Sequence, residues 1–65
     1  MKQKPRARLA VDIGGTFTDV VLDRRGQPRV TTKLLTTQAH PGEAVLEGIG
    51  RVLREAGLDA GDVGL

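Results

Sequence analysis

The sequence predicts an α/β segment in which three strands are followed by one helix. Two observations predict the strands: apolar residues recur along three short runs, and turns rich in glycine and proline separate those runs. A third predicts the helix, because apolar residues recur at helical spacing after Pro41. The chain has 65 residues and no cysteine, so it holds at most one small domain without a disulfide. We therefore expect a piece of a larger domain.

The strands are expected at residues 8–13, 17–22 and 29–35. The second strand carries apolar residues on both faces, which predicts that it is covered on both sides. It is expected to pair antiparallel with the third strand, across a connection in which Gly26 takes left-handed backbone. Near the end of the chain, Val63 and Leu65 are expected to begin a fourth strand.

Pro41 suits the first position of a helix, where its missing N–H costs nothing, and Gly57 suits the position that ends one. The apolar stripe expected to face the sheet is Val45, Leu46, Ile49, Val52, Leu53 and Ala56. Gly48 and Gly50 lie inside this helix at a cost in helix propensity. We interpret them as positions that let the helix lie close to a sheet. His40 is expected in the preceding loop or as the N-cap.

Positive charge gathers at the start of the chain, where no acidic residue accompanies Lys2, Lys4, Arg6 and Arg8. The remaining six basic residues face eight acidic ones, which leaves the body from Leu9 onward at about −2. We interpret residues 1–8 as a solvated basic tail. A basic tail can also contact nucleic acid or an anionic membrane, but no aromatic residue that could stack on bases accompanies it.

Targeting and membrane segments are not evident in the sequence. Asp12 interrupts the first apolar run too early for the core of a signal peptide. No stretch approaches the ~20 apolar residues of a membrane span. We therefore expect a soluble, cytoplasmic protein with neither a nucleic acid nor a membrane as its partner.

The stretch with the most chemical content is residues 11–19, where a Gly-Gly turn joins the first two strands. Its simplest interpretation is a structural hairpin, because the tight turns of hairpins need positive φ. Three details favour a binding role instead. Asp12 is a carboxylate suited to hydrated Mg²⁺, adjacent Gly14 and Gly15 let backbone N–H groups approach an anion, and the hydroxyls of Thr16 and Thr18 can donate to phosphate.

Other phosphate and nucleophile motifs are missing. There is no Gly-x-x-x-x-Gly-Lys-Ser/Thr loop and no Gly-x-Ser-x-Gly elbow. The two glycines are adjacent and precede a strand rather than a helix, which excludes the dinucleotide fingerprint. His40, the single histidine, is interpreted as a loop residue rather than a catalytic one.

The residues of the turn resemble a known phosphate motif. Residues 12–16 read Asp-Ile-Gly-Gly-Thr and resemble the first phosphate motif of the actin, heat-shock-chaperone and sugar-kinase superfamily of ATPases. A longer string, residues 12–19, resembles the N-terminal region of the hydantoinase A and oxoprolinase family, as do residues 33–37 and 44–49. This resemblance extends from about residue 8 to residue 65.

The resemblance implies an incomplete ribonuclease-H-like domain of the actin-like ATPase type, with ATP and Mg²⁺ as cofactors. It implies an ATP-dependent hydrolase of cyclic amides, or a related ketone carboxylase subunit, in which the substrate carbonyl oxygen is phosphorylated. The implied partners are the remainder of the parent polypeptide and a hydantoinase B-type subunit. This chain alone is not expected to turn over substrate.

Carried over by position, the residues implied to bind the ATP phosphates or line their cleft are Gly14, Gly15, Thr16, Thr18 and Asp19. Asp12 is implied to face Mg²⁺ through water, whereas Phe17 is expected in the core. Two positions depart from the family pattern, since Gln38 and His40 stand where the family usually reads proline and aspartate. Both are expected to touch the start of the helix more than the turn.

Two alternatives stay open at this point. The first is a free-standing βββα binding module whose basic tail contacts an anionic partner. The second is a fragment of a sugar kinase that shares the Asp-Ile-Gly-Gly-Thr turn. In those kinases the residue after the threonine is usually charged or polar, so Phe17 argues against this alternative.

Overall fold

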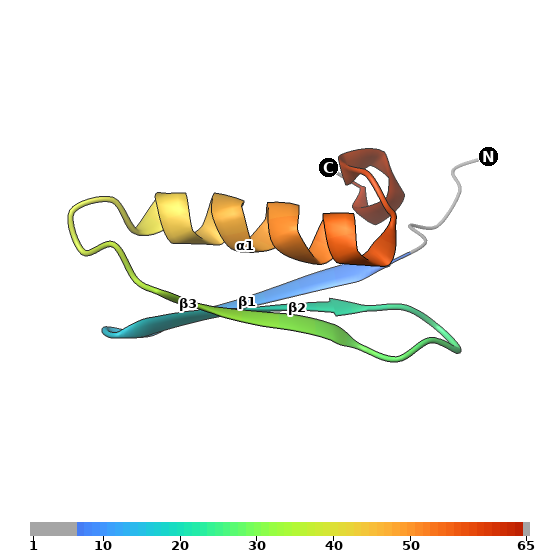
Figure 1. Ribbon diagram of the computed structural model, residues 1–65, viewed down its shortest axis with the longest axis horizontal. Coiled ribbons are helices and arrows are strands. Elements are labelled where there is room, and N and C mark those ends of the chain that lie inside the picture. Colours follow the sequence, from blue (N-terminus) through green and yellow to red (C-terminus); the bar gives the residue numbers. More distant parts are fainter. Residues whose placement is uncertain (1–6, 65) are drawn as a thin grey trace.

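The computed structural model describes residues 7–64 and shows a three-stranded antiparallel sheet with one helix along one face (Figure 1). Its elements are β1 (Arg8–Ile13), β2 (Phe17–Asp23), β3 (Val30–Leu35), α1 (Pro41–Ala56) and the 3₁₀ helix η1 (Ala60–Val63). The strand order is β1-β2-β3, so β2 is the central strand. The predicted βββα order and antiparallel pairing are confirmed, an arrangement consistent with the N-terminal piece of a domain.

The register of the strands separates two faces of the sheet. Thr18, Val20 and Leu22 of β2 are fully buried beneath α1. Because side chains alternate along a strand, the intervening residues lie on the opposite side, which we call the open face. The strand residues of the open face are Arg8, Ala10, Asp12, Phe17, Asp19, Val21, Asp23, Thr31, Lys33 and Leu35.

The helix lies unusually close to the sheet at Gly48, which is buried. A Cβ atom there would lie 2.5 Å from Cγ2 of Val20 and 2.9 Å from Cδ1 of Leu34. The interpretation of Gly48 as a position of close approach is confirmed. It is wrong for Gly50, because a Cβ atom at that position would meet only the side chain of Arg54.

Close packing at Gly48 also fixes the rotation of α1. The buried helix residues are Ala44, Gly48, Val52 and Leu53. Leu46 stands two positions from Gly48, about 200° around the helix, and is 73% exposed. The predicted stripe is therefore wrong at Leu46, because the contact of Gly48 with the sheet turns Leu46 toward solvent.

The ends of α1 follow the predicted signals. Pro41 opens the helix and His40 is its N-cap, without a side-chain hydrogen bond to the helix. Gly57 ends it with φ 71°, and the Leu58 N–H donates to the Leu53 carbonyl at 2.9 Å. This is the hydrogen bond that closes a Schellman motif.

The expected fourth strand at Val63 is wrong, because η1 occupies that position. Asp59 and Asp62 cap each other reciprocally, with the Asp59 N–H donating to Oδ2 of Asp62 at 3.0 Å. Such a capping box stabilises the first turn of a helix. The Asp62 carbonyl accepts from the N–H of buried Ala7 at 3.2 Å. Leu65 lies outside the described residues.

Two further expectations concern cover and charge. Phe17 is 44% exposed on the open face, so its expected place in the core is wrong. Within residues 7–64 only one face of β2 is covered.

Of the basic tail, Lys2, Lys4 and Arg6 lie outside the described residues. None of the helices in the described part of the chain has the length and apolar character needed to cross a membrane.

Candidate functional site

The turn between β1 and β2 is closed by one backbone hydrogen bond, from the Gly14 N–H to the Phe17 carbonyl at 2.8 Å. Neither Gly14 nor Gly15 has positive φ, so the explanation of this pair by a tight hairpin turn is wrong. Space is tight at Gly14, because a Cβ atom there would lie 3.0 Å from the Phe17 carbonyl oxygen. At Gly15 a Cβ atom would meet nothing within 4 Å.

The carbonyl groups of the turn are held by the segment that follows β3. The hydroxyl of Thr36 donates to the Gly14 carbonyl at 2.9 Å, and Nε2 of Gln38 donates to the Gly15 carbonyl at 3.1 Å. The backbone N–H of Thr36 donates to the Thr16 carbonyl at 2.8 Å. Three consecutive carbonyls of the turn therefore accept hydrogen bonds from residues 36 and 38.

Two amide groups of the same turn, unlike its carbonyls, have no hydrogen-bond partner in the described part of the chain. Within residues 7–64, the N–H groups of Gly15 and Thr16 have no acceptor, and both residues are exposed. The Thr16 hydroxyl likewise has no partner there. Backbone amides that are exposed and close together in a turn form a site for an anion.

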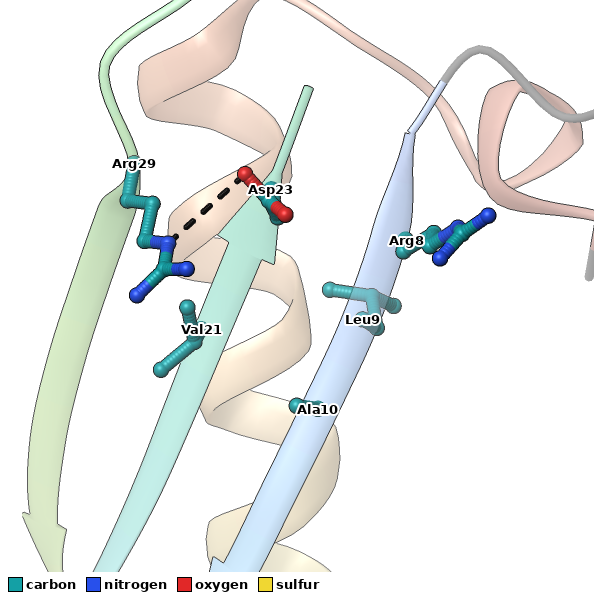
Figure 2. Close-up of a pocket in the computed structure, with 6 residues that line it drawn as sticks. All are labelled: Arg8, Leu9, Ala10, Val21, Asp23 and Arg29. Atoms are coloured by element: carbon teal, nitrogen blue, oxygen red, sulfur yellow. Dashed lines mark ion pairs between the residues drawn. The ribbon is translucent and has the colours of Figure 1, made fainter. Parts of the chain in front are cut away.

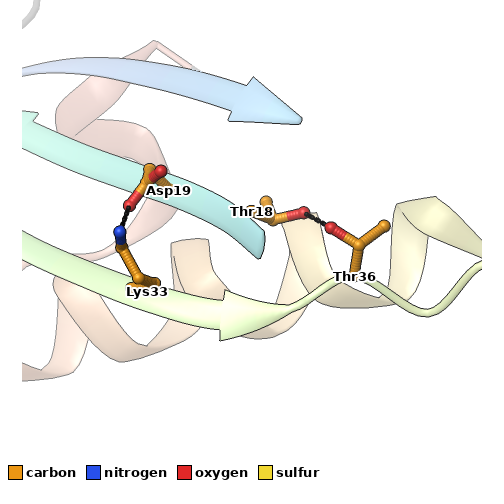
Figure 3. A network of polar contacts seen from close by, with 4 residues as sticks. All are labelled: Thr18, Asp19, Lys33 and Thr36. Carbon is orange, nitrogen blue, oxygen red and sulfur yellow. Dashed lines mark hydrogen bonds and ion pairs between the residues drawn. The ribbon is translucent and has the colours of Figure 1, made fainter. Parts of the chain in front are cut away.

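Thr18 has a different place from the other implied ligands. It is fully buried on the helix side of β2, and its hydroxyl lies 2.9 Å from the hydroxyl of Thr36 (Figure 3). The single hydroxyl proton of Thr36 is donated to Gly14, so Thr18 is the donor in this contact. The structure thus places Thr18 among the supports of the turn and not among the groups open to a ligand.

Two carboxylates lie beside the turn on the open face. Asp12 and Asp19 stand directly opposite each other across β1 and β2, an arrangement in which like charges repel. Lys33 continues the row on β3, with Nζ 3.6 Å from Oδ1 of Asp19 (Figure 3). The same Nζ lies 5.3 Å from the centroid of the Phe17 ring. Within residues 7–64 Asp12 has no ion-pair partner. The row therefore retains one uncompensated negative charge.

The donor set bears on which cation fits. No group of three or more histidine or acidic residues suited to hold a metal occurs in the described part of the chain. Mg²⁺ is usually bound by one or two carboxylates, keeps several waters and shares phosphate oxygens. Asp12 and Asp19 beside an exposed amide pair fit that mode better than a cage made of protein ligands alone.

A separate cavity of about 400 Å³ lies at the other end of the open face (Figure 2). It is lined by Arg8, Leu9, Ala10, Val21, Asp23 and Arg29. Nε of Arg29 lies 3.7 Å from Oδ1 of Asp23, and both side chains are more than half exposed. None of these residues belongs to the turn or to the Asp12–Asp19–Lys33 row.

Sequence reasoning placed the turn and its carboxylates but missed three residues. Lys33, Thr36 and Gln38 were not predicted to belong to the site. The expectation that Gln38 touches the helix start more than the turn is wrong, because its amide donates to Gly15. Extending the antiparallel pairing of Phe17 with Leu35 by one step would have placed Thr36 beside Thr16.

These observations define the class of the chain: a βββα segment in which a glycine turn between antiparallel strands presents free amides beside two carboxylates. A family model described as the hydantoinase/oxoprolinase N-terminal region matches residues 8–65. The chain belongs to this family. Comparisons with curated proteins and with solved structures gave no match.

Proposed function

We propose that the turn formed by Gly14, Gly15 and Thr16 binds the phosphates of ATP within an ATP-dependent hydrolase of cyclic amides. The observation that carries this proposal is the pair of amides without an acceptor, beside Asp12, which has no ion-pair partner within residues 7–64. Membership of the hydantoinase/oxoprolinase family supports the hydrolase class. A ketone carboxylase subunit of related type would use the same turn in the same way.

The turn contributes hydrogen-bond donors. The N–H groups of Gly15 and Thr16, together with the Thr16 hydroxyl, donate to phosphate oxygens. Hydrogen bonds to a charged acceptor are stronger than those between neutral groups. Gly15 lets phosphate approach closely, because the space where a Cβ atom would stand is open.

The open face contributes charge. Asp12 holds a water of hydrated Mg²⁺, and Asp19 lines the same cleft with Lys33 at its side. When bound, ATP supplies a phosphoryl group to the carbonyl oxygen of the substrate. Positioning and charge neutralisation are the main tasks of a protein in such a transfer, and these residues perform part of both.

The proposal extends to the surroundings of the segment. The remaining groups of the nucleotide site come from the rest of a parent polypeptide, with a hydantoinase B-type subunit as partner and the cytoplasm as compartment. The exposed apolar side chains of Val11, Ile13, Phe17 and Leu35 are compatible with cover from such additional chain.

The test compares Asp12→Asn with Asp23→Asn in the complete parent protein. Both aspartates lie on the open face, but Asp23 is at the far end from the turn. Loss of a carboxylate that acts on a metal through water lowers metal affinity by about 10–100-fold. We expect Asp12→Asn to raise the Mg²⁺ concentration needed for ATP hydrolysis by that factor and Asp23→Asn to leave it unchanged. Equal Mg²⁺ dependence in both variants would contradict the proposal.

A further inference from the structure

We infer that Thr36 and Gln38 are positioning residues that set the direction of the two free amides in the turn. This inference rests on the proposed phosphate-binding role of the turn. Neither residue is offered as a ligand of phosphate. Both donate hydrogen bonds to the carbonyls of Gly14 and Gly15, on the side of the turn opposite to the free amides.

The geometry of the peptide bond carries the argument. In a trans peptide the C=O of one residue and the N–H of the next lie in one plane and point in opposite directions, and the described chain contains no cis peptide. Thr36 holds the Gly14 carbonyl, so the N–H of Gly15 points away from Thr36. Gln38 holds the Gly15 carbonyl, which directs the N–H of Thr16 away from Gln38.

Without these bonds each peptide plane would be free to rotate. A rotation by half a turn would present a carbonyl oxygen where a donor had been, and that oxygen would repel a phosphate. Glycine offers little steric resistance to such rotation, and two of the three residues in this turn are glycines. The supports are therefore needed most where the backbone itself is least restrained.

The two supports differ in how firmly they are anchored. The Thr36 hydroxyl accepts from Thr18, which is fully buried, so the contact extends from the core to the turn (Figure 3). Gln38 is exposed, and within residues 7–64 its side chain makes one hydrogen bond, the one to Gly15. We therefore expect Thr36 to have the larger effect.

The test measures ¹⁵N relaxation of the Gly15 and Thr16 amides in the complete parent protein, without anion. Order parameters of rigid backbone are about 0.85, and flexible backbone falls below about 0.6. We expect both amides to be rigid in the native chain and in Thr36→Ser, and the Gly15 amide to become flexible in Thr36→Val, which lacks the hydroxyl. Gln38→Ala should lower the order parameter of Thr16 more than that of Gly15.

A second arm titrates the same proteins with inorganic pyrophosphate and follows the two amide shifts. Loss of one support should weaken pyrophosphate binding about tenfold in Thr36→Val, and less in Gln38→Ala, with Thr36→Ser close to native. Absence of any shift in the native chain would count against the proposed function, whereas the relaxation arm judges the positioning role independently.

The inference is overturned if Thr36→Val leaves the Gly15 amide as rigid as in the native chain, or if Thr36→Ser loosens that amide to the same extent as Thr36→Val. Should Thr36→Val fail to fold, Gln38→Ala decides alone, because Gln38 is exposed and its removal leaves the core intact. Unchanged order at Thr16 in that variant would then overturn the inference.

Discussion

The two turns at opposite ends of β2 both use glycine, but for different physical reasons. In the connection from β2 to β3, Gly26 has φ 75°, and the turn is closed locally by the Gln27 N–H donating to the Arg24 carbonyl at 3.2 Å. In the turn from β1 to β2 no glycine has positive φ. Its carbonyls accept hydrogen bonds from Thr36 and Gln38, 22 and 23 residues away in the sequence.

The difference concerns which groups remain available to a ligand. A turn closed by its own backbone needs glycine for conformation. The Gly14–Thr16 turn is held by hydrogen bonds from residues 36 and 38 to its carbonyls, and within residues 7–64 its amides at Gly15 and Thr16 have no acceptor. Glycine there provides space, for the chain at Gly14 and for an incoming group at Gly15. Substitutions at the two turns should therefore separate conformation, space and binding.

Among substitutions at the two turns, the largest change in stability is expected for Gly14→Ala. The new Cβ atom would lie 3.0 Å from the Phe17 carbonyl oxygen, the acceptor that closes the turn. Overpacking of this kind costs about 2 kcal/mol, and urea unfolding followed by circular dichroism would measure it. An unchanged unfolding midpoint would show that the turn adapts without strain.

Gly26→Ala should destabilise the protein by about 1 kcal/mol, because alanine disfavours left-handed backbone. No side chain crowds this position, so conformation alone is at issue. The amide shifts of Gly15 and Thr16 should stay at their native values in this variant. A change at those amides would mean that the two turns are coupled and that the comparison between them fails.

Gly15→Ala should change the free energy of unfolding by less than about 0.5 kcal/mol, since a Cβ atom there meets nothing and φ is not positive. Pyrophosphate affinity should nevertheless fall, because the methyl group occupies the approach of the anion. The matched control is Gly61→Ala, at a position with equally open space far from the turn. Equal affinity in both variants would contradict a binding role for Gly15.

The smallest effect is expected for Arg29→Gln at the far turn. The ion pair of Arg29 with Asp23 joins side chains that are 71% and 52% exposed, and exposed pairs contribute about 0–1 kcal/mol. We expect a loss below about 0.5 kcal/mol that disappears in 1 M salt. A larger, salt-independent loss in urea unfolding would show that Arg29 packs on the sheet as well.

Local signals predicted much of this fold. Alternating apolar residues placed the strands within one residue of their observed bounds, and Pro41 and Gly57 marked the ends of α1. Leu46 was misplaced because the rotation of a helix depends on where it touches the sheet. The fourth strand was misplaced because the Asp59–Asp62 capping box outweighs two apolar residues.

In the candidate site, too, the residues that lie close together in the sequence were predicted and those brought in by strand pairing were not. The turn and its carboxylates lie within one continuous stretch, so their residue types were enough to locate them. Thr36 and Gln38 reach the turn only through the pairing of β3 with β2. A role that depends on pairing between distant strands has no local signature, which is why neither residue was predicted to belong to the site.

The long sequence separation of the Thr36 and Gln38 contacts has a consequence for folding order. The hairpin of β1 and β2 is local and can form early, since hairpins close within microseconds. Its amides gain a fixed direction only after β3 pairs with β2 and residues 36–38 reach the turn. Contacts between distant residues form more slowly than local ones. A nascent chain that ends before residue 36 would thus contain the entire glycine motif, but the direction of its Gly15 and Thr16 amides would not yet be fixed.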